Sequence, residues 1–179
     1  MSKSAEKFDP ISCLDDEFYE YTGGKDAEGE CHGNGYLEYD DGSYLSGSWI
    51  HGVRNGHFRF DTCNTKCPVL SLEGDYISDE LTGRARIKLP DETWMEGWFK
   101  QSVLHGFCRK FDKNHQLSWV GMFRNGAPFG VCWQMMPGGG CVVGHVDEEG
   151  NLTGSNIAYI YPDFVTAYIG QFSNGVFIK

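Results

Sequence analysis

The chain has 179 residues, 25 of them acidic and 15 basic, so its formal net charge is -10 at pH 7. This charge repels the phosphates of nucleic acids and of anionic lipid surfaces, and we expect neither direct nucleic-acid binding nor membrane association. No apolar stretch is long enough to span a membrane, and residues 1–10 lack the apolar core of a secretion signal. We expect a monomer in the nucleus and/or the cytoplasm.

Glycine and aromatic residues are abundant, with 24 Gly, 12 Phe, 9 Tyr and 5 Trp. An average soluble domain holds about 7% Gly, so this composition favours many short strands joined by tight turns. The cysteines number seven, which is odd, and they are not densely spaced as in a disulfide scaffold. All seven are expected to be reduced thiols.

Two regions follow one another along the chain. Residues 1–19 are expected to form an acidic, flexible segment, and residues 20–179 a repeat array of six to seven units. In the array a glycine, termed the anchor, recurs every 23 to 27 residues, and a second glycine follows it by nine or ten positions. Such a two-glycine frame predicts tandem repeats. The anchors are Gly24, Gly47, Gly74, Gly97, Gly121, Gly144 and Gly170, and the second glycines are Gly33, Gly56, Gly83, Gly106, Gly130 and Gly154.

One unit can be followed from Ser43 to Asp61. Residues 43–49 alternate as a strand does, residues 51–56 are turn formers, and residues 57–60 alternate again as a returning strand. A glycine in a turn permits positive φ, and a glycine inside a strand lets a neighbouring ring lie over the backbone. Turn formers also separate the units, for example at 90–93. The sequence predicts an all-β fold, a single-layer twisted antiparallel meander of tandem β-hairpins with little or no helix.

The strand period of two assigns residues to faces. One face carries the residues two before and two after each anchor, and we expect it to be a continuous core. It includes Leu45, Leu72, Met95, Trp119, Val142 and Tyr168. The opposite, second face carries acidic residues on outgoing strands and basic residues on returning strands, which can pair across the sheet. These are Glu73, Asp75 and Glu96, and Arg59, Arg84, Arg86, Lys88 and Arg109.

The repeat frame resembles a known family of repeats. Residues 44–56, YLSGSWIHGVRNG, fit the pattern Y-x-G-x-W-x-x-G-x-x-x-G of the MORN repeat. The last units are more specific, with GVCW at 130–133, VGHVDEEGNLTG at 143–154, IAYIYPD at 157–163 and TAYIG at 166–170. They resemble the N-terminal MORN region of the SET-domain family known as histone-lysine N-methyltransferase SET seven/nine.

The resemblance covers residues 20–179 and implies a parent enzyme. In that family a SET domain transfers a methyl group from S-adenosylmethionine to a lysine of histones and other nuclear proteins. The SET domain follows the repeats and supplies the cofactor pocket, so it is expected after residue 179. The resemblance therefore implies no cofactor site and no catalytic residue within this chain.

A metal site and a phosphate loop can each be considered and set aside. Cys63 and Cys67 could begin a zinc site, but a second ligand pair is missing from the sequence. We expect no bound metal and a solvent-exposed insertion loop at residues 61–69. Gly138 to Gly140 precede neither a lysine nor a helix, so they do not form a phosphate loop.

Two further constellations have simpler explanations. His32 and His105 precede second glycines, and Cys108 lies near His105, which could suggest a nucleophile pair. Other repeats have Asn, Thr or Phe directly before the second glycine. A position that accepts such different residues is expected to be part of a turn rather than a catalytic site. The arginines of the second face could bind phosphoinositides, but the interleaved carboxylates favour a solvated, internally paired face.

The second face changes polarity along the chain. Its middle repeats are charged, whereas its later positions are apolar, and apolar residues on both faces of a sheet imply cover on both. Monomers rarely expose much more than a few hundred Å2 of contiguous apolar surface. We therefore predict a docking surface within residues 120–172, most simply for a SET domain; alternatively, the C-terminal hairpin folds back over it. The candidate docking residues are Val120, Met122, Val131, Trp133, Met135, Val143 and Ile169.

Two functions fit these observations. The first is a non-catalytic scaffold or docking region of a protein-lysine methyltransferase, with the SET domain or another protein as its partner, including one with a basic Lys-rich tail. The alternative is a free-standing MORN-repeat adaptor for protein partners or a membrane-proximal assembly. A complete small enzyme finds no support, because no acid–base or nucleophile set converges on one repeat.

We predict that the isolated chain neither binds S-adenosylmethionine nor methylates histone peptides, because the resembled family places both functions in the SET domain. Isothermal titration with the cofactor should give no stoichiometric heat. A signal of one cofactor per chain would show that residues 1–179 contain a cofactor site.

Overall fold

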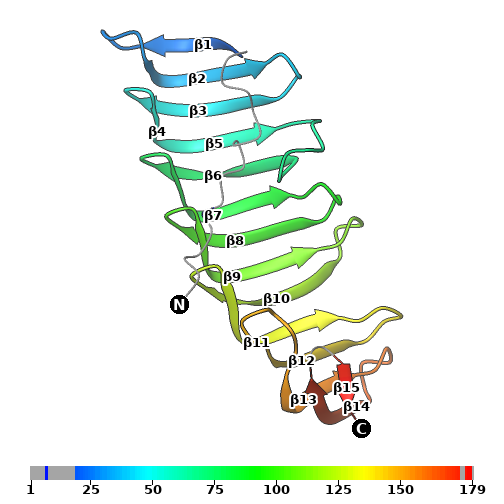
Figure 1. Ribbon diagram of the computed structural model, residues 1–179. Helices are drawn as coiled ribbons and strands as arrows, with labels where there is room; N and C mark the ends of the chain where they lie inside the picture. Colours follow the sequence, from blue (N-terminus) through cyan, green and yellow to red (C-terminus); the bar gives the residue numbers. More distant parts are fainter. Residues whose placement is uncertain (1–6, 8–18, 174–175, 179) are drawn as a thin grey trace.

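The chain forms one open sheet in a computed structural model that describes residue 7, residues 19–173 and residues 176–178. These residues form fifteen β-strands and no helix. Fourteen strands pair antiparallel in chain order, and the short β4 pairs with β3 (Figure 1). The predicted all-β antiparallel meander is confirmed. The described part of the chain holds no helix that is long and apolar enough to cross a membrane.

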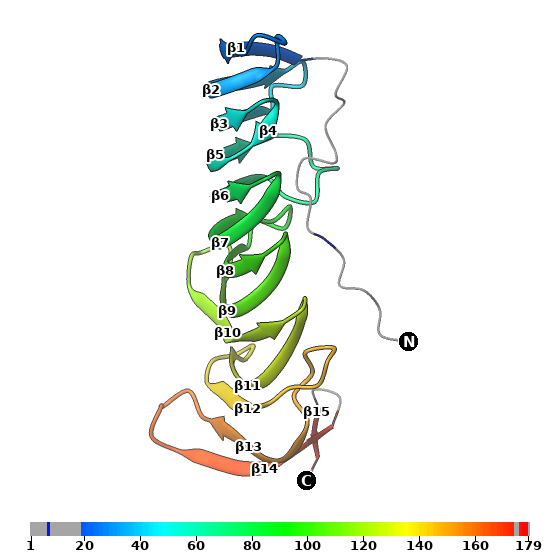
Figure 2. The ribbon, with the colours of Figure 1, turned by 90° about the vertical axis from the view of Figure 1, so that its left-hand side faces the viewer.

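Seen from the side, the strands stack as a single curved layer (Figure 2). The strands are β1 (Tyr19–Lys25), β2 (Cys31–Tyr39), β3 (Tyr44–Ile50), β4 (Val53–Arg54), β5 (Gly56–Asp61), β6 (Ser71–Ile77), β7 (Glu80–Lys88), β8 (Trp94–Lys100), β9 (Val103–Phe111), β10 (Leu117–Arg124), β11 (Ala127–Met135), β12 (Cys141–His145), β13 (Gly154–Ile160), β14 (Ala167–Ser173) and β15 (Val176–Ile178). The segment expected at residues 1–19 lies, except for Lys7 and Tyr19, outside the described residues.

Tight turns along one edge of the sheet, which we term the hairpin tips, connect the two strands of a unit. In four tips both central residues have positive φ, as in type I′ turns, whose twist matches that of the flanking strands. The second residue of each also donates its backbone N–H to a carbonyl of the preceding unit, at 2.9 to 3.1 Å. Neighbouring tips are therefore stacked by hydrogen bonds. The four tips are His51–Gly52, Ser78–Asp79, Gln101–Ser102 and Asn125–Gly126.

The two glycines of the frame meet different physical demands. The six second glycines, from Gly33 to Gly154, all have positive φ, between 69° and 125°. The five anchors from Gly47 to Gly144 instead lie beneath side chains of the core face. A Cβ on Gly47 would overlap the ring of Phe58, and a Cβ on Gly121 would overlap the ring of Trp119. The predicted positive φ and the predicted close approach over a strand glycine are confirmed, but the second glycines lie within strands rather than in turns.

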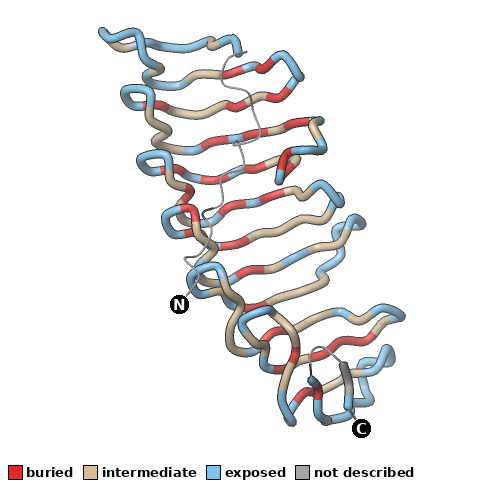
Figure 3. Tube along the Cα trace, in the orientation of Figure 1, coloured by how far each residue is buried: buried red, intermediate tan, exposed pale blue. Residues whose placement is uncertain are grey.

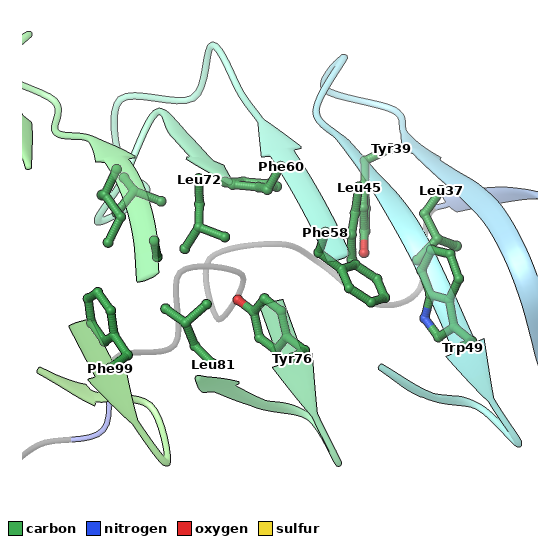
Figure 4. Packing of buried hydrophobic residues seen from close by; sticks show 13 residues of the cluster. Leu37, Tyr39, Leu45, Trp49, Phe58, Phe60, Leu72, Tyr76, Leu81 and Phe99 are labelled. Carbon is green, nitrogen blue, oxygen red and sulfur yellow. The ribbon is translucent and has the colours of Figure 1, made fainter. Parts of the chain in front are cut away.

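The core consists of two separate clusters, so the expectation of a continuous core is wrong. Figure 3 shows where buried residues lie along the chain. The larger cluster extends from Leu37 to Phe99, with aromatic rings and leucines interleaved along the sheet (Figure 4). Between the clusters the cross-strand register places Lys110 and Gln134 on the core face. Their polar ends cannot be buried among apolar neighbours without cost. The smaller cluster is formed by Cys132, Val142, Leu152, Ile157 and Phe172.

The insertion at residues 61–69 is not the solvent-exposed loop that we expected. Cys67 and Val69 are only 1% and 0% exposed, and Val69 joins the larger core cluster. The hydroxyl of Thr62 hydrogen-bonds that of Ser43 at 2.6 Å, which fastens the insertion to the preceding turn. Cys67 is disulfide-bonded, so the expectation of seven reduced thiols is also wrong. The described free cysteines are Cys31, Cys63, Cys108, Cys132 and Cys141.

We predict that Gly47→Ala lowers the free energy of unfolding by about 1–3 kcal/mol, because the new methyl group overlaps the fully buried Phe58 ring. Gly83→Asn is the matched control. No atom lies within 4 Å of a Cβ at Gly83, and Asn tolerates a φ of 69° better than most residues do. Urea unfolding should show a clearly smaller loss for the control, and equal losses would contradict the separate roles of the two glycines.

Candidate docking face

The cross-strand register arranges the second face as one row of residues, which we term the second-face row. From β5 to β9 the row is charged and alternates in sign: Arg59, Glu73, Arg86, Glu96 and Arg109. From β10 to β14 it is apolar: Val120, Trp133, Val143, Ala158 and Ile169. The polarity therefore changes at a single step, between Arg109 and Val120.

The charged half is neutralised within the sheet, most clearly around Glu96. The Glu96 side chain is 12% exposed and pairs with Arg84 at 2.8 Å, Arg109 at 2.5 Å and Arg86 at 3.8 Å. Burial alone would raise the pKa of Glu96, but hydrogen bonds and charges from Arg109 and Arg84 outweigh it and lower the pKa. Glu96 is therefore ionised at neutral pH, and the predicted cross-strand pairing is confirmed for this residue.

Other charges of this half are also paired. Arg59 contacts Asp61 on its own strand at 2.8 Å. His57 lies between two carboxylates, 2.9 Å from Asp75 and 3.3 Å from Glu73. Each basic group named here has an acidic partner within the sheet, which is the paired face that the sequence favoured over a lipid-binding stripe.

The apolar half brings all the candidate docking residues onto one face. Val120, Trp133, Val143 and Ile169 lie in the second-face row itself. The other three lie beside it on the same strands and remain open to solvent. These are Met122, Val131 and Met135, which are 39%, 51% and 36% exposed.

The described residues of the C-terminal strands continue the sheet edge to edge. β14 pairs edge to edge with β13, and β15 with β14, so these strands extend the sheet. Ile169 in β14 is 69% exposed. Among the described residues, a folded-back hairpin therefore does not cover Ile169.

Sequence reasoning missed several residues of the same face. Ala158 completes the apolar half of the row, and Trp98 and Phe107, which are 51% and 44% exposed, extend the apolar surface toward Arg109. Together with charged neighbours, Trp98 and Phe107 line a shallow pocket of about 240 Å3. Their positions directly after an anchor and a second glycine could have placed them on the second face. The charged residues around them made that part of the face look uniformly polar in the sequence.

The residues considered for catalysis do not form a reactive pair. Cys108 is fully buried, and this burial raises the pKa of its thiol to about 11, so it is not a thiolate at neutral pH. His105 is exposed near the start of β9, where its Nδ1 accepts a hydrogen bond from the backbone N–H of Asn125 in the next hairpin tip at 3.4 Å. Cys63 is free and exposed, whereas Cys67 is buried and disulfide-bonded, so this pair is not available as a zinc ligand set.

Comparison with known proteins shows what this chain is similar to. Residues 123–179 match the family described as histone H3 K4-specific methyltransferase SET7 N-terminal. The chain is also 31% identical over 167 residues to histone-lysine N-methyltransferase SETD7 of Halocynthia roretzi. The predicted resemblance to the N-terminal region of the SET seven/nine methyltransferases is confirmed. The alignment covers 93% of this chain but only 42% of that relative, so the chain spans less than half of the methyltransferase it matches.

The segment that matches the SET7 N-terminal family overlaps the apolar half of the second-face row. Residues 123–179 contain Val131, Trp133, Met135, Val143 and Ile169, while Val120 and Met122 lie just before them. The part of the chain that is most specific to the methyltransferase family is thus also the part whose second face is apolar.

We predict that Glu96→Gln lowers the free energy of unfolding at neutral pH by about 1 kcal/mol, because pairs between partly exposed charges contribute about 0–1 kcal/mol each. The folded-state pKa of Glu96 is below its ordinary value of 4.5, so its contribution to stability is present above that value. It is lost as the pH falls through the folded-state pKa. Urea unfolding across this acidic range should therefore show a shallower pH dependence in Glu96→Gln. Glu148→Gln, at an exposed turn, is the control, and identical curves for the two variants would contradict the assignment.

Proposed function

We propose that this chain is the non-catalytic MORN-repeat scaffold of a protein-lysine methyltransferase, and that the apolar half of its second-face row docks the catalytic SET domain. The observation that carries the proposal is the change from paired charges, which end at Arg109, to half-buried and exposed apolar residues, which begin at Val120. Charges that neutralise one another can face water. A row of apolar side chains is instead stabilised when another part of a protein packs over it and removes it from water.

The SET domain is the occupant that best fits the comparisons. The matched methyltransferase is more than twice as long as the region that aligns with this chain, so it has ample sequence for a second domain. A domain joined to the array by a linker has a high effective concentration at the surface, so a modest interface suffices. Interfaces between domains of one chain commonly bury about 600–1,500 Å2.

The description of the matched relative suggests an activity for the whole protein. It describes a histone-lysine N-methyltransferase, so we propose S-adenosylmethionine as the cofactor and a lysine of a histone or another nuclear protein as the substrate. The proposed location is the nucleus and/or the cytoplasm. The net charge of -10 on the array would attract a Lys-rich tail at long range and so favour such a substrate.

Dye binding tests the docking proposal. We predict that the isolated chain binds a dye specific for exposed apolar surface, and that the full-length methyltransferase binds much less, because its catalytic domain covers the apolar half of the row. The double variant Val131→Lys with Ile169→Lys should reduce dye binding to the isolated chain. It should also weaken docking in the full-length protein, measured as faster hydrogen exchange in β11 and β14.

A matched control separates docking from general surface effects. Ile77 is 59% exposed on the same face but lies in the charged half, so Ile77→Lys should leave docking unchanged. Equal and low dye binding by the isolated chain and the full-length protein would remove the proposal. Strong dye binding by both would instead favour the free-standing adaptor, whose apolar surface waits for a separate protein.

A further inference from the structure

The first two hairpin tips bring together three side chains that the sequence did not associate. Asp26 lies in the turn between β1 and β2, His32 is the second residue of β2, and His51 is the first residue of the next tip. Their ligand atoms all lie within 4.8 Å of one another. Within the described residues this is the only group of three or more such side chains with this geometry.

Tip stacking creates the cluster. The backbone N–H of Gly52 donates to the carbonyl of Cys31 at 2.9 Å, which holds the second tip against the start of β2. As a result, the ring of His51 lies 5.1 Å from that of His32, centroid to centroid. Nδ1 of His51 also lies 2.8 Å from Oδ2 of Asp26.

The Asp26 carboxylate is held in place before any ligand binds. Its side chain is only 6% exposed, and its Oδ1 accepts hydrogen bonds from the backbone N–H groups of Glu28 at 3.1 Å and Glu30 at 2.8 Å. Burial raises its pKa, but these hydrogen bonds and that with His51 prevail and lower the pKa. Oδ2 is left to face the histidines as an oriented, ionised ligand, the arrangement that outer hydrogen bonds commonly give metal-binding carboxylates.

We propose that Asp26, His32 and His51 bind one Zn2+ ion, which links the first two hairpin tips and leaves an open position for water. Two imidazole nitrogens and one carboxylate oxygen are a ligand set that zinc favours, whereas Mg2+ and Ca2+ prefer oxygen ligands alone. Zinc–ligand bonds of about 2.0–2.2 Å bring ligand atoms to about 3.3 Å apart. The exposed side chains of His32 and His51 can rotate through the small distance required.

Zinc binding exchanges one interaction for another at His51. The ion replaces the hydrogen bond between Nδ1 and Asp26, and the Nδ1 proton of the neutral ring is transferred to Nε2. Both histidines bind the metal as neutral rings, each through one ring nitrogen.

Later pairs of neighbouring hairpin tips are linked by other polar contacts. Arg54 pairs with Asp79 at 2.8 Å between the second and third tips, and the hydroxyl of Ser102 accepts the N–H of Leu81 at 2.9 Å between the third and fourth. Between the first and second tips, a metal ion would provide the link. It would support β1, which lies at the open edge of the sheet and is exposed at every position but Tyr21.

The test uses the untagged, metal-free chain titrated with Zn2+ by calorimetry. We expect one ion per chain and a rise in melting temperature with Zn2+ but not with Mg2+. His32→Asn, His51→Asn and Asp26→Asn should each weaken binding at least tenfold. His51→Asn is the sharpest variant, because Asn tolerates the φ of 49° at this position and the turn is preserved.

Two controls address other zinc ligands. His57→Asn removes an exposed histidine that also has carboxylate partners, Asp75 and Glu73, and should leave zinc affinity unchanged. Cys31→Ser removes the thiol nearest in sequence to His32 and should also have no effect. The Co2+ form should lack the strong near-ultraviolet absorption of thiolate ligands.

Three results would overturn the proposal. These are no binding at zinc concentrations of hundreds of micromolar, equal affinity in His32→Asn and His51→Asn to that of the parent chain, and a thiolate spectrum in the Co2+ form. Circular dichroism of each metal-free variant, matched to that of the parent chain, ensures that lost binding is not lost folding.

Discussion

The sheet depends on how closely a side chain of one strand can lie over the backbone of the next. Within the described residues no second sheet or helix covers the core face of this single layer, so the large side chains of that face lie flat across neighbouring strands. They can do so only where the strand beneath them has no Cβ. Gly47 beneath Phe58 and Gly121 beneath Trp119 are the clearest cases, and a Cβ on Gly97 would lie 2.6 Å from Leu104.

The second glycines bend the strands. The register shifts opposite Gly74 and Gly97, where the returning strands carry extra residues around Gly83 and Gly106, and such bulges kink a strand and increase its twist. The strands are visibly curved in side view (Figure 2). With the tips stacked by hydrogen bonds such as Asp79 to Arg54, each unit contacts mainly the units before and after it. Consequently the polar contacts between one pair of neighbouring tips can differ from those between the next pair without disturbing the fold.

The repeats and the two-residue period of the strands could be predicted from the sequence. The glycine frame indicated the strand order, and alternation alone placed Val120, Trp133 and Ile169 on one face. Alternation did not reveal the break in the core, because the register of returning strands depends on the bulges. Lys110 and Gln134, which interrupt the core, both stand on returning strands.

Contacts between units could also not be predicted from the sequence. Asp26, His32 and His51 are separated by 6 and 19 positions and meet only because one tip stacks on another. The burial of Cys67 and its disulfide likewise depend on where the insertion packs, since a disulfide requires close approach of two particular backbones rather than a sequence spacing.

The paired charges of the second face also set a limit on what can dock there. A partner that covered Glu96 and its arginines would have to remove water from several charges, and the effective cost is several kcal/mol per ion. No such cost applies beyond Val120, where the row is apolar. In the proposed docking function, the step between Arg109 and Val120 would therefore act as a boundary that favours a partner on the C-terminal strands over one on the middle repeats. Because the core face is occupied by the array's own side chains, the second face and the hairpin tips are the surfaces through which this single-layer protein can bind others.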